Sequence, residues 1–140
     1  MRAVLDANVL VSGLISRKGP PGQILDCWLE ERFQLSISPK ILRELQRVLQ
    51  YSRIQERLVE GQAAALLKQL DVTANMVAGT LKLDVLTRDP SDNIYLACAV
   101  EAQADYLVTG NSGHFDEAGT SYRGVSILTP RLFLEILGKE

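Results

Sequence analysis

The stretch that decides the fold is DPSDNIYLACAVEAQADYLVTG, residues 89–110. Its first two residues are typical of a helix start, because Asp89 can cap the first turn and Pro90 tolerates the first helical position. The segment that follows is apolar on nearly every side, which indicates a helix buried in the middle of a domain. Residues 106–109 are then typical of a buried strand. A buried helix followed by a buried strand favours an α/β fold.

Strands and helices alternate along the rest of the chain as well. Short apolar runs predict buried strands at residues 3–5 and 125–128, and an alternating pattern predicts another at 33–37. Further predictions are a helix after the loop 17–22, a helix that starts at Ser38-Pro39, helical spacing over 54–70 that Gly61 divides in two, a strand over 72–77 and a last helix after Thr129-Pro130. This alternation predicts an α/β domain with a largely parallel sheet, and residues 1–140 are expected to form a single domain.

Composition narrows the class of protein. The chain is 46% hydrophobic, which is enough for a globular core. Cys27 and Cys98 lie far apart inside helical patterns, so we expect reduced, buried thiols and no zinc site. No apolar run approaches the roughly 20 residues of a membrane span and no signal peptide is recognisable, so we expect a cytoplasmic protein. The formal net charge of −2 neither indicates nor excludes a nucleic-acid partner.

Three distant segments each bring a carboxylate to the boundary of an element. Asp6 ends the first apolar strand, where a buried charge is costly without a partner or a metal. Glu44 lies about 40° outside the apolar arc of its helix, on the border between core and solvent. Asp92 lies in the first turn of the central helix. Because ligands bind beyond the carboxyl ends of parallel strands, these acids and residues 109–111 are expected to meet at one edge of the sheet.

The donor types at this edge favour a hard divalent cation. Carboxylates and the amide of Asn111 are oxygen donors, which suit Mg²⁺ or Mn²⁺ better than zinc. The only histidine is His114, so a histidine-rich metal site is excluded. A carboxylate-bound divalent ion can bind a phosphodiester oxygen, lower the pKa of a water and stabilise the leaving oxygen. The residues therefore predict a phosphodiester nuclease with Asp6 and Asp92 as principal ligands.

Each candidate also has an ordinary structural role. Asp92 can offset the helix dipole, and Asp89 is expected to cap its helix rather than to bind a metal. Asn111 is either a site residue or a left-handed turn residue. The other roles weighed are a plain surface position for Glu44, a loop-holding role for Asn8, a β-forming or ligand-orienting role for Thr109 and a local bond for His114. The cations Arg17, Lys18, Arg43, Arg47 and Arg88 can contact phosphates, although scattered surface positions are expected for them.

Four pieces of the sequence, in order, resemble the PIN domain family. They are VLDANVL at 4–10, SP with LREL at 38–45, RDPSDN at 88–93, and ADYLVTGN at 104–111 followed by HF at 114–115. The resemblance implies a three-layer α/β/α domain with a central, mostly parallel sheet of about five strands flanked by helices. It also implies a metal-dependent endoribonuclease whose acids are Asp6, Glu44 and Asp92, with Asn8 or Thr109 as a polar helper.

The resemblance is nearest to members that are toxins of toxin–antitoxin pairs. It implies an RNA substrate, single-stranded or structured, a Mg²⁺ or Mn²⁺ cofactor, an antitoxin partner and a homodimer or higher oligomer. The chain departs from the family pattern at Asn111, where many members carry a fourth acid. This departure predicts weaker binding of a second ion and low activity, and Asp116 can replace the acid only if its loop folds back.

Two other functions stay open at the level of sequence. The first is a PIN-like module that binds RNA or a protein without cutting, and the uncharged Asn111 is the reason to consider it. The second is an aspartyl-phosphate enzyme or receiver domain, which also places an aspartate after a buried strand. That second function requires a lysine near a later strand end, and residues 109–111 offer none.

Overall fold

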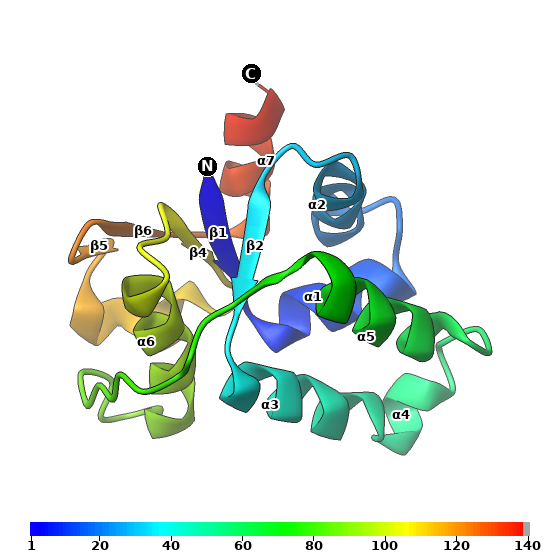
Figure 1. The fold of residues 1–140 in the computed structure, drawn as a ribbon, viewed down its shortest axis with the longest axis horizontal. Coiled ribbons are helices and arrows are strands. Elements are labelled where there is room, and N and C mark those ends of the chain that lie inside the picture. The colour runs from blue at the N-terminus through cyan, green and yellow to red at the C-terminus, as the bar shows by residue number, and fades with distance from the viewer. Residues whose placement is uncertain (139–140) are drawn as a thin grey trace.

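The computed structural model describes residues 1–138, and a six-stranded sheet forms its centre (Figure 1). The strands are β1 (Arg2–Leu5), β2 (Gln34–Ile37), β3 (Asn75–Met76), β4 (Tyr106–Val108), β5 (Ser121–Tyr122) and β6 (Val125–Leu128). Their order is β3-β2-β1-β4-β6-β5, and all neighbours are parallel except β5 and β6. The mostly parallel α/β architecture is confirmed, with six strands where about five were expected.

Helices cover both faces of the sheet. They are α1 (Ala7–Ile15), α2 (Pro20–Leu29), α3 (Pro39–Leu49), α4 (Ser52–Gln55), α5 (Gln62–Thr73), α6 (Asn93–Glu101) and α7 (Pro130–Gly138), with short 3₁₀ turns η1 (Pro90–Asp92) and η2 (Ser112–Ala118). Helix α6 packs against β1 and β4 on one face, whereas α1, α2 and α7 lie on the other (Figure 1). No helix within residues 1–138 is long and apolar enough to cross a membrane.

The strand order reverses between β1 and β4. Strand β1 pairs with β2 on one side and with β4 on the other, and Leu5 lies opposite Val108 in the β1–β4 ladder. The backbone N–H of Asp6 then donates to the carbonyl of Val108 over 3.0 Å. In parallel α/β sheets, ligands bind at such a reversal, beyond the carboxyl ends of the strands. The residues that follow β1 and β4 therefore lie at the place where a ligand is expected.

The central helix and its capping pattern are mostly as predicted. Helix α6 is buried on most sides, as expected from its apolar sequence. Ser38 caps α3 by accepting a bond from the N–H of Ile41, with Pro39 at the first helical position. Gly61 has φ +85° and separates α4 from α5, as the sequence indicated. Cys27 and Cys98 are buried and free.

Helix α1 and strand β3 differ from the sequence predictions, and strand β5 was not predicted. No helix was predicted for residues 7–15, yet α1 begins directly after β1 with Asp6 as its N-cap. Six of the nine residues of α1 are buried, so its sequence lacks the amphipathic period that identifies surface helices. The strand predicted over residues 72–77 is wrong for its first half, because α5 continues to Thr73 and only Asn75–Met76 pair with β2.

Helix α2 approaches the preceding loop so closely that Gly22 has no room for a side chain. A Cβ at this position would lie 2.4 Å from the backbone oxygen of Arg17. We expect Gly22→Ala to destabilise the protein by about 1–3 kcal/mol, because the contact is with backbone and cannot rotate away. Gly113→Ala, whose Cβ would meet nothing within 4 Å, is the matched control. Equal urea midpoints for the two variants would contradict this prediction.

Candidate metal centre

Asp6 lies at the carboxyl end of β1 and is only 3% exposed. One of its oxygens accepts a bond from the backbone N–H of Asn8, and the hydroxyl of Thr109 donates to the other, each over 3.0 Å. Burial raises the pKa of Asp6, an effect that these two bonds oppose and the nearby charge of Asp92 reinforces. The carboxylate is thus held in a fixed orientation at an electrostatic cost that a bound cation would offset.

Thr109 links the ends of β1 and β4. Its side chain is fully buried, and besides donating to Asp6 its hydroxyl accepts a bond from the backbone N–H of Asn111 over 3.0 Å. This places Thr109 as an orienting residue behind Asp6, one of the two roles expected for it. Asn111 has φ −117°, so the left-handed turn considered for it is not formed. Its exposed side chain lines the same cleft as Asp6.

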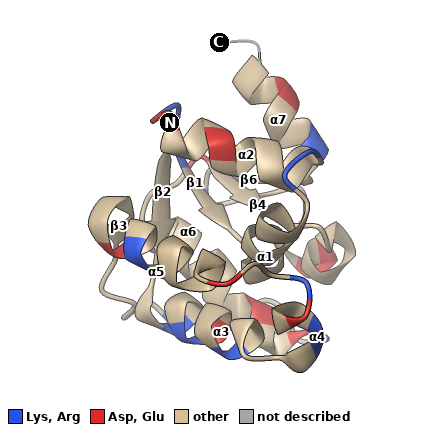
Figure 2. Ribbon diagram, turned by 90° about the vertical axis from the view of Figure 1, so that its right-hand side faces the viewer, with Lys and Arg blue, Asp and Glu red and all other residues tan. Residues whose placement is uncertain are grey.

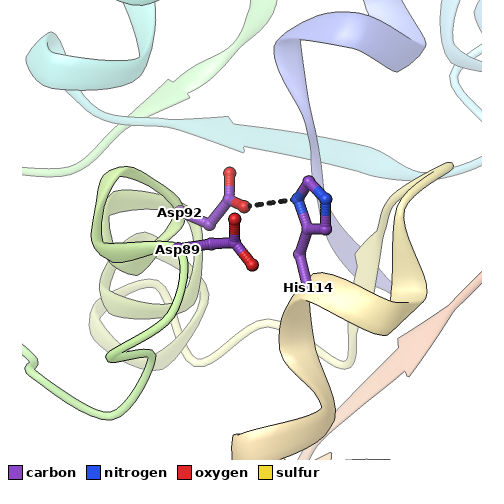
Figure 3. A group of neighbouring side chains, drawn as sticks. All are labelled: Asp89, Asp92 and His114. Carbon is purple, nitrogen blue, oxygen red and sulfur yellow. Dashed lines mark hydrogen bonds and ion pairs between the residues drawn. The ribbon is translucent and has the colours of Figure 1, made fainter.

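Asp89, Asp92 and His114 form a cluster at the start of α6 (Figure 3). The imidazole Nδ1 of His114 lies 2.9 Å from a carboxylate oxygen of Asp92, a side chain that is 16% exposed. Burial raises the pKa of Asp92, and the bond to His114 opposes that shift. Donor atoms of all three residues lie within 4.8 Å of one another, so the group has the dimensions of a metal site.

The cluster corrects two sequence predictions. Asp89 makes no side-chain capping bond, although capping was its expected role, and its carboxylate points toward His114 and Asp92 (Figure 3). His114 does not make a merely local bond, because its partner Asp92 is far from it in sequence. Helix α6 itself begins at Asn93, so Asp92 lies at the junction of η1 and α6 rather than inside the helix.

Glu44 lies on α3 at the border between core and solvent, as its helical phase predicted. Its side chain is 30% exposed, and both carboxylate oxygens accept bonds from Arg47, at 2.6 Å from Nη2 and 3.3 Å from Nε. Arg47 also donates to the hydroxyl of Tyr51. The arginine was expected to be a scattered surface cation, whereas it lies beside a candidate metal ligand.

These residues line one cleft of about 230 Å³ at the carboxyl edge of the sheet. Its lining is Asp6, Ala7, Asn8, Glu44, Arg47, Asp89, Ser91, Asp92, Tyr95, Asn111 and His114. The four predicted ligands, Asp6, Glu44, Asp92 and Asn111, are therefore brought together from four separate segments. Asn8 and Asp89 join them, while Thr109 lies behind Asp6. This lining contains neither a lysine, which an aspartyl-phosphate enzyme requires, nor Asp116.

Sequence reasoning missed Tyr95 and expected Arg47 to be a scattered surface cation, although a simple spacing would have indicated both as lining residues. Tyr95 follows Asp92 by three positions and Arg47 follows Glu44 by three, so each shares a helical face with a predicted ligand. Tyr95 is buried, and its hydroxyl lies 3.4 Å from the backbone nitrogen of Ala7. It therefore connects α6 to the first turn of α1 at the floor of the cleft.

Glu117 fixes the two segments that carry the cluster. From η2 it accepts bonds from the backbone N–H groups of Thr87 and Arg88, at 2.8 and 3.0 Å, and from the Thr87 hydroxyl. These bonds lower the pKa of Glu117, the hydroxyl of Thr87 contributing most. Since Thr87 and Arg88 lead into Asp89 and η2 carries His114, this carboxylate sets the spacing between the two sides of the cluster.

The fold and the cleft define a class of protein: an α/β domain with a candidate metal site at the reversal point of a parallel sheet. Residues 2–113 match the PIN domain family, so the chain belongs to this family, whose members are generally nucleases. It is 30% identical to the uncharacterized protein MJ1680 of Methanocaldococcus jannaschii, over 79% of this chain and 71% of that protein. The crystal structure of PAE2754 from Pyrobaculum aerophilum superposes with a TM-score of 0.62 at 18% identity, covering all of this chain and 91% of that one, which supports the fold.

Asp6→Asn and Asp92→Asn are each expected to stabilise the metal-free protein at pH 7. Folding raises the pKa of both acids, so the folded state binds their protons more tightly and the free energy of unfolding falls as pH rises from the ordinary to the raised pKa. The amide of asparagine does not ionise, so the variants do not lose this free energy of unfolding as the pH rises. Thermal unfolding in EDTA should give a higher Tm for both variants at pH 7, and the gain should shrink toward about pH 4.

The exposed acid Asp71 on α5 provides the control for this comparison. Asp71→Asn is expected to leave Tm unchanged, because surface substitutions away from special features have little effect. A lower Tm for Asp6→Asn in EDTA at pH 7 would show that the lost hydrogen bonds outweigh the relief of the buried charge.

Proposed function

We propose that this protein is a divalent-metal-dependent endoribonuclease that hydrolyses phosphodiester bonds of single-stranded or structured RNA. One observation carries the proposal: acids from three segments, with Asn111 from a fourth, line a single cleft beyond the carboxyl ends of β1 and β4. Membership of the PIN domain family supports nuclease chemistry at that cleft.

The donor set fits Mg²⁺ or Mn²⁺. Carboxylate and amide oxygens are the ligands these ions prefer, and the single imidazole of His114 is compatible with Mn²⁺. Asp6, Glu44 and Asp92 would hold the ion, with Asn111 contributing its carbonyl oxygen. Burial is the main cause of the raised pKa of Asp6 and of Asp92, with a smaller contribution from neighbouring carboxylates, so these charges lack part of the compensation that water would give. A divalent cation supplies that compensation.

The bound ion would supply activation of a water for attack and stabilisation of charge on the phosphate and the leaving oxygen. The other roles belong to the protein. Thr109 and the N–H of Asn8 hold the Asp6 carboxylate in one orientation, and His114 positions Asp92. Arg47 brings a positive charge to the rim of the cleft, where a phosphate would lie.

We further propose that the protein is the toxin of a toxin–antitoxin pair, acting in the cytoplasm as a homodimer or higher oligomer. The motifs that resemble those of toxins of the family support this role. An antitoxin of this kind is encoded beside its toxin. A neighbouring gene whose product co-purifies with this chain and suppresses its nuclease activity is the expected finding.

Asp6→Asn and Asp92→Asn are expected to abolish RNA cleavage, because each removes a charged ligand while preserving shape. Cleavage of a labelled RNA by the wild-type protein should require Mg²⁺ or Mn²⁺ and stop in EDTA. We expect each variant to lose at least about 10²-fold in kcat/KM, in line with the loss of a positioned electrostatic group. Undiminished cleavage by both variants, with unchanged circular dichroism, would overturn the proposal.

Asn111→Asp is expected to raise the activity, because it restores the charge that many family members carry at this position. The increase should be largest at low Mn²⁺ concentration, where occupancy of the ion limits the rate. Asp116→Asn, in the same 3₁₀ region but outside the lining of the cleft, should change nothing. If wild type and Asn111→Asp both bind RNA in EDTA and neither turns it over with any divalent ion, the protein is a binding module instead.

A further inference from the structure

One face of α3 carries three cations in a row. Lys40, Arg43 and Arg47 are spaced by three and four residues, so at 100° per residue they fall within an arc of about 60°. All three are exposed, and Lys and Arg recur along α3 and into α4 in Figure 2. We name these three residues the α3 basic face. This local concentration of positive charge contrasts with the formal net charge of the whole chain, which is −2.

The α3 basic face adjoins the candidate metal centre. Arg47 itself lines the cleft, next to Glu44 on the same helix. Lys40 lines a neighbouring cavity of about 240 Å³ that reaches Pro90, the residue between the cleft-lining Asp89 and Ser91. The two cavities therefore lie on either side of the start of η1, with Lys40 at one of them and Arg47 at the other.

The guanidinium of Arg47 bonds to two side chains, those of Glu44 and Tyr51. It engages both oxygens of Glu44, and it donates to the hydroxyl of Tyr51, whose ring centroid lies 5.5 Å away. Arg53 lies over the same ring at 5.7 Å and extends the cationic surface beyond α3. Each oxygen of Glu44 keeps a further lone pair, so a metal ion bound there would compete with Arg47 through charge, by repelling the guanidinium and drawing on the same negative charge. Such an exposed ion pair is weak, so breaking it costs little.

We propose that the α3 basic face binds the phosphate backbone of single-stranded RNA entering the cleft, and that Arg47 exchanges Glu44 for a backbone phosphate when a divalent cation occupies the metal centre. The identity of the ligand as RNA rests on the proposed function. After the exchange, Tyr51 still holds the guanidinium at the rim. The same cation thus completes the metal site and makes a phosphate-binding group available.

The geometry favours a single strand of RNA over a duplex or an acidic protein. Asp6 lies at the floor of the cleft with 3% exposure, so the phosphate to be cut must descend to it, which a flexible strand does and a rigid helix does not. A folded acidic protein, like a duplex, is too rigid to reach Asp6. An acidic peptide would meet the same like charges as a phosphodiester, so competition with polyglutamate decides between these two ligands.

The binding test measures the anisotropy of a fluorescein-labelled single-stranded RNA dodecamer in EDTA, between about 25 and 200 mM salt. Lys40→Gln and Arg43→Gln are each expected to weaken binding several-fold and to reduce the slope of log K against log[salt] by about 0.7 for each phosphate that the variant no longer neutralises. Arg123→Gln is the control, because it removes the same charge from an exposed arginine that precedes β6, near the edge of the sheet opposite β3.

The exchange at Glu44 is tested by Mn²⁺ binding, followed by the electron paramagnetic resonance signal of the free ion. Arg47→Gln removes the competitor of the cation, so we expect Mn²⁺ to bind several-fold more tightly. In the presence of Mn²⁺, Arg47→Gln should weaken RNA binding more than it does in EDTA. If the RNA is cleaved, a raised KM reports this loss; if it is not, the anisotropy titration in Mn²⁺ reports it directly.

The outcomes separate this inference from the proposed function. RNA binding by Lys40→Gln and Arg43→Gln with the affinity and salt slope of the wild type would overturn RNA binding by the α3 basic face, even if the nuclease is active. Weaker Mn²⁺ binding by Arg47→Gln would show that Arg47 only supports Glu44. Displacement of the RNA by polyglutamate at equal charge concentration would indicate an acidic protein partner. Absence of cleavage alone would leave RNA binding by the α3 basic face standing.

Discussion

The parallel pairing of β1 with β4 is the constraint on which the rest of the structure depends. It places two strand ends side by side, so that Asp6 bonds to the carbonyl of Val108 through its N–H and to the hydroxyl of Thr109 through its carboxylate. The same hydroxyl accepts from the N–H of Asn111, which orients the start of the next loop. Three polar residues that follow two neighbouring strands are thereby fixed at the edge of a largely apolar sheet.

The helices add acids to this fixed edge at an electrostatic cost. Asp92 and Glu44 approach from η1 and α3, and burial raises the pKa of Asp92 as it raises that of Asp6. Further cations in the cleft would reduce this electrostatic cost. Among the described residues that line it, however, Arg47 is the only Lys or Arg. The protein therefore keeps an excess of negative charge at one point of its surface, which is the condition that a divalent ion satisfies.

Much of this arrangement could be predicted from the sequence. The strand before Asp6, the buried character of α6 and the border position of Glu44 all follow from local periodicity, which burial on one or both faces imposes. The sequence predictions that failed did so for physical reasons. Helix α1 is buried on most sides and gives no period, and β3 is too short to show alternation. The bond between His114 and Asp92 depends on how η2 folds back, which no local pattern encodes.

The short edges of the sheet restrict how copies of the chain can associate. Strand β3 at one edge and β5 at the other contain two residues each, so neither offers a long row of free backbone groups to another strand. Growth of the sheet across a subunit boundary is therefore disfavoured. Any association with a second copy or with another protein would then rely on side chains, so shape and charge rather than main-chain pairing would select the partner.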